Sequence, residues 1–285
     1  MKLKLLIGMI VLAITSGGVF LVLRSRQNNS SVNSAPKSKS QTAEPSYTLN
    51  LDQNQYLPNT PIQLRVAIQD QENKNVTRFK GTSITPVHVI SIKKDGSNFQ
   101  HLLAAINRST GMVEVSELQF DQPGAYRIFA EFSPENGTKD DFGNDKIYAP
   151  YQDIEVGSAA DASVALKAEK LNDTANGINV NLSVMEGDGV GNDLVGTSLN
   201  LSVRYKTGET PFTQLEPYLG KLGHMVVLDS NLNYLQADVV TDEMLPQSGL
   251  VVYQATFPKA GQYQLYVMSK AQNTFNTNSF VMDVK

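Results

Sequence analysis

The sequence has no cysteine, which excludes a disulfide framework, a thiolate metal site, a cysteine nucleophile and a lipidated N-terminal cysteine. It also has no basic excess, since 24 Lys and Arg stand against 28 Asp and Glu, for a formal net charge of −4. Such a chain offers no electrostatic footprint for nucleic acid, and we expect no nucleic acid as a partner. Stability must come from packing, and 285 residues that are 41% hydrophobic suffice for two domains with cores of their own.

The recognisable catalytic motifs are missing as well. The sequence contains no Gly-x-Ser-x-Gly elbow, no His-Glu-x-x-His, no Gly-x-x-x-x-Gly-Lys phosphate loop and no kinase motif set. With three histidines, a general base would have to come from a carboxylate pair, which spacing cannot reveal in a β protein. We predict that the protein is not an enzyme, and we rank an unrecognised carboxylate active site last.

Residues 5–23 form an uncharged, largely apolar run that follows Lys2 and Lys4 and ends before Arg24. At a rise of about 1.5 Å per residue, this run nearly spans a hydrocarbon core of about 30 Å. The run is longer than that of a cleaved signal peptide, and Arg-Ser-Arg follows where a small-x-small cleavage site would stand. We therefore expect an uncleaved signal-anchor helix that contacts the membrane through residues 5–23.

The organisation around this anchor follows from charge and composition. Positive charge is nearly balanced on its two sides, so the orientation rests on the short basic tail, which is typical of a signal anchor. We predict a single-pass protein of the cytoplasmic membrane whose C-terminal domains are extracytoplasmic, on the periplasmic or cell-surface side. Residues 1–24 would be the anchor, and the polar residues 25–46 a disordered linker.

From residue 47 onward, short β-branched and aromatic runs alternate with polar residues and are separated by Gly, Pro, Asn and Asp. This stretch also consists of two copies of one pattern. Pro-Val-His88 aligns with Leu-Gly-His224, and three further blocks align in the same order at offsets of 135 to 137 residues. We predict an all-β protein with two tandem Ig-like β-sandwich domains, at residues 47–157 and 164–285, after the N-terminal transmembrane helix.

Each copy contains a Gly-x-Tyr segment, with Gly124 and Tyr126 in the first copy and Gly261 and Tyr263 in the second. Ig-type sandwiches place a tyrosine at one corner, where its hydroxyl bonds backbone a few residues upstream. We predict this role for both tyrosines. The glycines would supply a backbone conformation that residues with a Cβ resist.

These motifs resemble a family of exported bacterial proteins with tandem Ig-like domains, related to YtkA-like domains and recognised by His-x-His-Pro loops. The resemblance covers most of the chain after residue 46, and the block Pro-Tyr-Leu-Gly-x-x-Gly-His that ends at His224 is intact. The loops are degenerate, because the first copy has His101 followed by Leu103, and the second has Gln236 and Asp238. The resemblance implies an exported sandwich pair, while the loss of His-x-His breaks the chelate that could hold copper.

Two histidines remain as candidate metal ligands. A strand carrying His88 would turn back through Lys-Lys-Asp-Gly toward His101, so the two side chains could approach each other. Two imidazoles alone make a weak divalent site, to which Met112 or Glu114 could add a ligand. Hydrogen-bonded structural histidines are the alternative that we rank first, and we expect a structural role for His224 as well.

Other features have simpler interpretations. Met225, Met244 and Met268 could suit Cu(I), but methionine at strand spacing is more often core filler. The acidic segments 140–145 and 186–193 lack the spacing of an EF-hand and are expected to be solvated turns.

Taken together, these patterns predict a membrane-anchored extracytoplasmic binding or adaptor protein without catalytic activity. We expect a protein partner, reached through sandwich loops or a strand edge, and no cofactor. The alternative is a periplasmic protein that handles copper or another metal through a residual site at His88 and His101.

Overall fold

The computed structural model describes residues 44–80, 86–158, 167–185, 194–241 and 248–285. The regular elements of this part of the chain are the β-strands β1 to β19, so the all-β prediction is confirmed there. The predicted membrane anchor and nearly all of the predicted linker lie outside the described residues. Among the described residues, no helix has the length and apolar character needed to cross a membrane.

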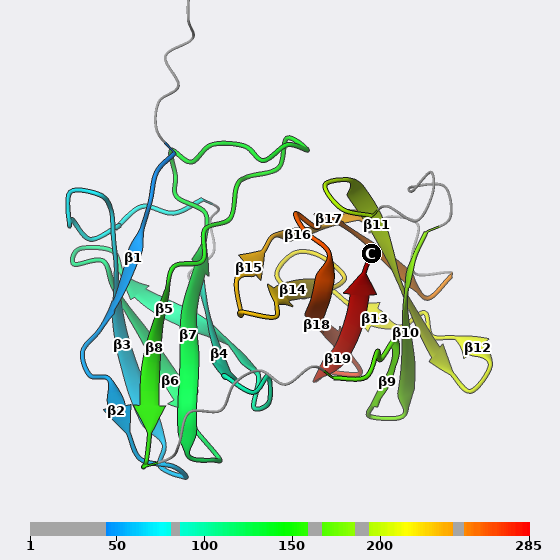
Figure 1. The fold of residues 1–285 in the computed structure, drawn as a ribbon, viewed down its shortest axis with the longest axis horizontal. Coiled ribbons are helices and arrows are strands. Elements are labelled where there is room, and N and C mark those ends of the chain that lie inside the picture. The colour runs from blue at the N-terminus through cyan, green and yellow to red at the C-terminus, as the bar shows by residue number, and fades with distance from the viewer. Residues whose placement is uncertain (1–43, 81–85, 159–166, 186–193, 242–247) are drawn as a thin grey trace, which may run out of the picture. The chain divides into compact units, whose positions relative to one another are not determined.

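The first sandwich consists of two layers of strands (Figure 1). One layer contains β1 (Thr48–Leu51), β3 (Ile62–Gln69) and β6 (Met112–Leu118). The other contains β4 (Val87–Lys93), β7 (Gly124–Phe132), β8 (Tyr151–Val156) and the short β2 (Gln55–Tyr56). Strand β5 (Gln100–Asn107) pairs with β4 through residues 100–104 and with β6 through residues 105–107, so it links the layers. Leu64 and Val66 from one layer and Tyr126 and Ile128 from the other meet in the first core.

The second sandwich is built in the same way. One layer contains β9 (Asn172–Ala175), β10 (Ile178–Val184), β11 (Ser198–Thr207), β12 (Thr210–Pro211), β16 (Ala237–Thr241) and β17 (Leu250–Thr256). The other contains β13 (Leu215–Glu216), β14 (His224–Asp229), β15 (Tyr234–Leu235), β18 (Gly261–Ala271) and β19 (Thr274–Val284). Leu201 and Tyr253 of the first of these layers meet Leu265 and Phe280 of the second in a separate core.

The tyrosine corners predicted for both copies are confirmed. The hydroxyls of Tyr126 and Tyr263 each donate to the backbone oxygen four residues upstream, at 2.8 Å in both copies. Gly124 has φ +140° and Gly261 has φ +144°, a region that favours glycine. The corner is therefore fixed by the same local chemistry in each sandwich.

Several central strands are buried on both faces. In β4, Val87 and Val89 pack in the first core. Ile90 and Ile92 point to the opposite face, where they join a third apolar cluster. This inter-sandwich cluster contains the buried residues Ile90, Ile92, Phe129, Tyr218, Val226, Leu228, Leu232, Tyr266 and Met268. Because it draws on both sandwiches, residues 44–285 form one compact unit.

The contact between the sandwiches has approximate two-fold character. Phe99 stacks on Tyr266, with ring centroids 3.9 Å apart and an interplanar angle of 2°. Tyr234 lies beside Phe129, with ring centroids 6.5 Å apart. In the repeat, Tyr234 matches Phe99 and Tyr266 matches Phe129, so exchanging the copies maps one ring pair onto the other. The two sandwiches thus contact each other through corresponding surfaces, as two identical subunits do in an isologous dimer.

Candidate metal centre

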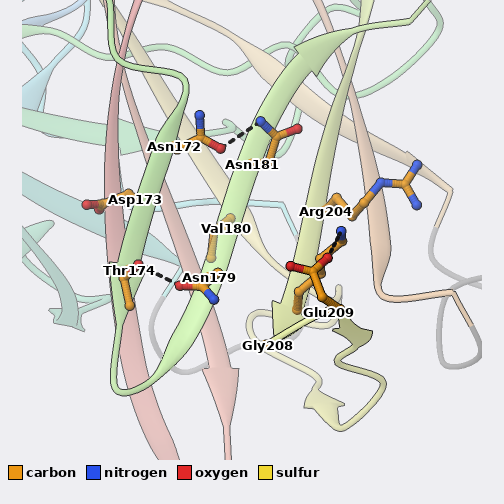
Figure 2. Close-up of a pocket in the computed structure, with 10 residues that line it drawn as sticks. Asn172, Asp173, Thr174, Asn179, Val180, Asn181, Arg204, Gly208 and Glu209 are labelled. Atoms are coloured by element: carbon orange, nitrogen blue, oxygen red, sulfur yellow. Dashed lines mark hydrogen bonds and ion pairs between the residues drawn. The ribbon is translucent and has the colours of Figure 1, made fainter.

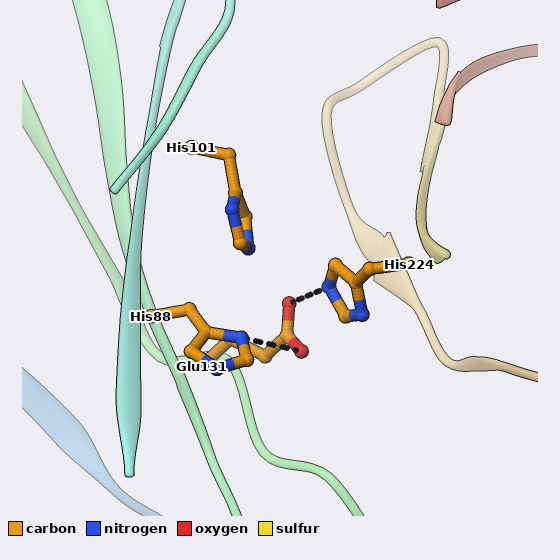
Figure 3. A group of neighbouring side chains, drawn as sticks. All are labelled: His88, His101, Glu131 and His224. Carbon is orange, nitrogen blue, oxygen red and sulfur yellow. Dashed lines mark hydrogen bonds and ion pairs between the residues drawn. The ribbon is translucent and has the colours of Figure 1, made fainter. Parts of the chain in front are cut away.

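Four polar side chains converge beside the inter-sandwich cluster: His88 from β4, His101 from β5, Glu131 from β7 and His224 from β14 (Figure 3). One potential ligand atom from each residue lies within 4.8 Å of the other three. The centroid of the His101 ring is 5.0 Å from those of both His88 and His224, and the latter two are 5.4 Å apart. The three imidazoles therefore form a nearly equilateral triangle next to one carboxylate.

Strand register brings the three residues of the first sandwich together. His88 lies on the face of β4 that carries Ile90 and Ile92, which is the face directed at the second sandwich. Glu131 is the direct cross-strand partner of His88, and His101 is the partner of Ile90. Directly opposed residues of an antiparallel pair project from the same face. All three side chains are therefore directed toward the second sandwich.

The fourth residue, His224, is delivered by the loop that precedes β14. Tyr218 and Lys221 exchange backbone hydrogen bonds of 2.6 and 3.1 Å across a turn in which Gly220 has φ +81°. Gly223 packs so closely that a Cβ there would collide with the hydroxyl of Tyr253. The intact Pro-Tyr-Leu-Gly-x-x-Gly-His block is therefore a tight loop that fixes where β14 begins.

Short polar contacts surround these groups. The Nε2 of His224 is hydrogen-bonded to the Oε2 of Glu131 at 3.1 Å, whereas the buried Nδ1 of His88 lies 3.5 Å from the Oε1 of Glu131 and makes no hydrogen bond there (Figure 3). The Nδ1 of His101 lies 3.0 Å from the hydroxyl of Tyr218, which belongs to the second sandwich. Among the described residues, the buried Nε2 of His101 has no hydrogen-bond partner. That atom is available to a ligand, and an unpaired buried polar atom is otherwise destabilising.

The pKa values of three of these groups are shifted, each in its own way. Burial raises the pKa of Glu131, but His224 and His88 outweigh it and hold that pKa well below its usual range. Burial lowers the pKa of His224, but the adjacent Glu131 carboxylate outweighs it and raises that pKa overall. Burial and the two neighbouring imidazoles lower the pKa of His101 well below its usual value. These shifts favour the ionised carboxylate of Glu131 and the neutral imidazole of His101, which are the forms that bind metal, whereas they favour the protonated form of His224, which has to lose its proton to bind a metal.

This set of donors suits a particular class of ion. Three imidazoles and one carboxylate, without thiolate, are typical ligands for zinc, copper and other divalent first-row metals. A tetrahedral ion about 2.0–2.1 Å from each ligand atom would separate those atoms by about 3.4 Å. The separation of 3.1 Å between the Nε2 of His224 and the Oε2 of Glu131 is close to this value, whereas the Nδ1 of His88 lies 3.5 Å from the other carboxylate oxygen. Because all four ligand atoms lie within 4.8 Å of one another, binding would shorten the remaining separations by at most about 1.4 Å, through rotation of the side chains.

The structure brings His88 and His101 together, as the sequence predicts, and adds two residues that are not among the metal ligands predicted from the sequence. Glu131 is one of the two, and a lone acid within the apolar strand Ala-Tyr-Arg-Ile-Phe-Ala-Glu-Phe is the feature of the sequence that indicates it. His224 was expected to be structural, although its alignment with His88 in the repeat pointed to a shared location. Met112 and Glu114, the two possible additional ligands, lie on β6 outside this group. Glu114 forms an ion pair with Arg65 there.

The remaining sequence candidates have separate outcomes. Met225 packs in the second core, whereas Met268 lies in the inter-sandwich cluster. Met244 and the acidic segment 186–193 lie outside the described residues. In segment 140–145, the Asp140 carboxylate accepts backbone N–H groups of Phe142 and Asn144, so this segment is a turn.

A depression of about 360 Å³ lies over β9, β10 and β11 of the second sandwich (Figure 2). Its short polar side chains bond to one another, as in the pairs Asn172 with Asn181 and Thr174 with Asn179 (Figure 2). These groups satisfy each other and do not converge on a common point. The depression therefore gives no second candidate centre.

The fold and the centre define a tandem β-sandwich protein with a histidine and carboxylate cluster where its two halves meet. The chain belongs to the family described as a domain of unknown function, DUF8832, whose profile matches residues 41–140 and 173–285. No curated protein matches the chain. The suggested relation to YtkA-like domains stays a prediction.

Solved structures give distant matches. Salmonella alpha-2-macroglobulin reacted with methylamine is 13% identical, with 84% of this chain and 15% of that chain covered and a TM-score of 0.25. The Escherichia coli adhesin FdeC is 14% identical, with coverages of 84% and 64% and a TM-score of 0.24. The Yersinia pseudotuberculosis adhesin InvE is 10% identical, with coverages of 83% and 58% and a TM-score of 0.23. The chain thus spans only part of each of these proteins, and likeness at this level carries no argument about function.

Proposed function

We propose that this protein is a non-catalytic metal-binding protein, anchored in the cytoplasmic membrane with its sandwiches outside the cytoplasm. The ion would be a first-row transition metal held by His88, His101, His224 and Glu131. The observation that carries the proposal is the approach of these four potential ligand atoms to within 4.8 Å of one another.

A purely structural role accounts poorly for this cluster. Glu131 is only 3% exposed, and burying a carboxylate carries a desolvation penalty that apolar residues of similar volume would avoid. The unpartnered Nε2 of His101 adds to that penalty. Sites that violate packing rules in this way are often functional ones, and a bound cation would compensate both groups at once.

The contact between Tyr218 and the ring of His101 also supports the metal proposal. If the Nδ1 of His101 carries its proton and donates to the Tyr218 hydroxyl, the Nε2 keeps a free lone pair directed at the cluster. A partner on the second ring nitrogen is the usual way in which proteins fix the tautomer of a metal-binding histidine. Because Tyr218 and His224 come from the second sandwich, a complete centre requires both copies.

The proposal keeps the predicted binding role and gives it a ligand. The predicted anchor at residues 5–23 supports a tethered protein outside the cytoplasm. A carrier of this kind would pass its ion to a protein partner. Protease treatment of intact spheroplasts tests the location, because extracytoplasmic sandwiches would be digested and cytoplasmic ones protected.

The metal proposal is tested by titrating the detergent-solubilised full chain with Zn(II) and with Cu(II) in competition with a chromophoric chelator. We expect one ion per chain, and we expect His88→Ala, His101→Ala and His224→Ala each to weaken binding by more than about 100-fold. Glu114→Gln is the matched control, since its carboxylate lies on β6 outside the cluster. A parent chain that binds no ion, or a His88→Ala and His101→Ala double variant that binds normally, would contradict the proposal.

A further inference from the structure

The duplication places Glu131 and Met268 at matching positions around the three histidines. Glu131 is the cross-strand partner of His88 between β4 and β7, and Met268 is the cross-strand partner of His224 between β14 and β18. The offset of 137 residues that aligns the two corner tyrosines also takes Glu131 to Met268. Each sandwich thus presents a histidine with one potential ligand beside it, a carboxylate in the first copy and a thioether in the second.

Met268 lies on the histidine side of its strand. Cross-strand partners share a face, with Cβ atoms about 4.5–5.5 Å apart, so the flexible methionine side chain can reach the neighbourhood of the His224 ring. Met268 is 4% exposed and belongs to the inter-sandwich cluster. It also lines a cavity of about 260 Å³ together with His101 and Tyr218. Met225, by contrast, packs in the core of the second sandwich.

We infer that the ion bound at this centre is copper in either oxidation state, with Met268 as the soft ligand for Cu(I) and Glu131 as the hard ligand for Cu(II). This inference rests on the proposed function, because it assigns the ion and one further ligand to the same centre. Imidazoles bind both oxidation states, a thioether favours Cu(I), and a carboxylate favours harder ions. The three histidines would remain common to both states.

The chemistry of zinc separates this inference from general metal binding. Zinc in proteins takes nitrogen, oxygen and thiolate ligands, so the thioether of Met268 would add nothing to a zinc complex. Met268→Leu roughly conserves the side-chain volume while replacing the thioether by a hydrocarbon, and leucine for methionine is among the best tolerated core exchanges. Loss of affinity for Cu(I) alone is therefore specific to ligation by sulfur.

The experiment uses the full chain in detergent under anaerobic conditions, with Cu(I) measured by competition with bicinchoninate and with Cu(II) and Zn(II) measured separately. We expect Met268→Leu to weaken Cu(I) binding about tenfold or more while leaving Zn(II) and Cu(II) unchanged. X-ray absorption at the copper edge should show a sulfur neighbour in the Cu(I) form of the parent and none in Met268→Leu. Glu131→Gln should weaken Cu(II) binding more than Cu(I) binding.

Met225→Leu is the matched control, because it makes the same exchange in the second core beside the same histidine. Equal Cu(I) affinity in the parent and Met268→Leu, with no sulfur neighbour in the parent, would overturn the inference. An equal loss in Met225→Leu would also overturn it, since that result would trace the effect to packing. In either case Zn(II) binding by the parent would leave the proposed function standing, whereas a parent that binds no metal would remove both.

Discussion

The two sandwiches follow the same chain path but contribute unequally to the centre. The first supplies His88, His101 and Glu131, and the second supplies His224. At the positions that match His101 and Glu131, the second sandwich has Gln236 and Met268. The two copies therefore surround the centre with different side chains, although corresponding strands carry them.

Gln236 illustrates this difference. Its amide nitrogen donates to the carboxylates of Asp238, at 2.8 Å, and Asp140, at 3.2 Å, and its oxygen accepts the backbone N–H of Ile147 at 2.8 Å. Asp140 and Ile147 belong to the first sandwich, so Gln236 holds the two copies together. The position of the candidate ligand His101 in the first copy is therefore occupied in the second copy by Gln236, a residue that hydrogen-bonds the two sandwiches together.

The largest expected effect tests whether the two sandwiches are independent. Leu64 and Leu201 are each fully buried in separate cores, so replacing either with alanine should lower the free energy of unfolding by about 2–5 kcal/mol. Because the inter-sandwich cluster joins the copies, we expect a single denaturant transition in both variants, followed by circular dichroism. If Leu201→Ala produced a second transition while the first sandwich unfolded at the parent midpoint, the copies would be independent units.

A smaller loss of stability is expected when alanine replaces the corner glycine of either sandwich, and the two losses can be compared directly. Alanine at φ +140° in Gly124→Ala or at φ +144° in Gly261→Ala should be destabilising by about 1–3 kcal/mol. The Cβ in Gly124→Ala would also lie 2.7 Å from the Cε of Lys93, whereas the Cβ in Gly261→Ala would meet nothing within 4 Å. We expect Gly124→Ala to have the lower melting temperature. Equal melting temperatures would mean that Lys93 moves aside freely and backbone strain alone decides.

Removing the hydroxyl of either corner tyrosine should have a smaller effect on stability. Tyr126→Phe and Tyr263→Phe each remove one hydrogen bond to backbone, which should lower the free energy of unfolding by about 0.5–1.5 kcal/mol. The Tyr126 hydroxyl also accepts a hydrogen bond of 3.0 Å from the amide of Asn98. Tyr126→Phe should therefore be the more destabilising variant in urea titrations. The reverse order would show that the bond from Asn98 adds nothing to stability.

The smallest expected effect depends on pH and belongs to the second sandwich. Burial raises the pKa of Asp229, but hydrogen bonds from Lys259 and Asn233 outweigh it and hold that pKa below its usual range. A carboxyl group whose pKa is depressed in the folded state stabilises the fold above its unfolded pKa of about 3.9, and this contribution is lost as the pH falls through the folded pKa. The stability difference between the parent and Asp229→Asn should therefore shrink below about pH 4. A constant difference between pH 6 and pH 3 in urea titrations would contradict this assignment.

Local patterns in the sequence predicted much of what proved to be local in the structure. Alternation with period two indicated the strands, and the Gly-x-Tyr segments indicated both corners, because such features depend on residues a few positions apart. The repeat also paired His88 with His224 before any contact was known. The pattern did not indicate which part of the chain covers the second apolar face of β4. A continuous apolar run indicates only that a strand is buried on both faces.

Only the tertiary structure decided the centre itself. His88 and His101 could be predicted to approach each other because they lie on strands joined by a short turn. Glu131 joins them through the register of β4 and β7, and His224 joins them because the second sandwich packs its outer sheet face against the first. That packing depends on the fit between two whole sheet faces rather than on any fixed spacing along the chain. The sequence by itself therefore determined two sandwiches with matching histidines, and the contact between the sandwiches assembled a four-residue centre from them.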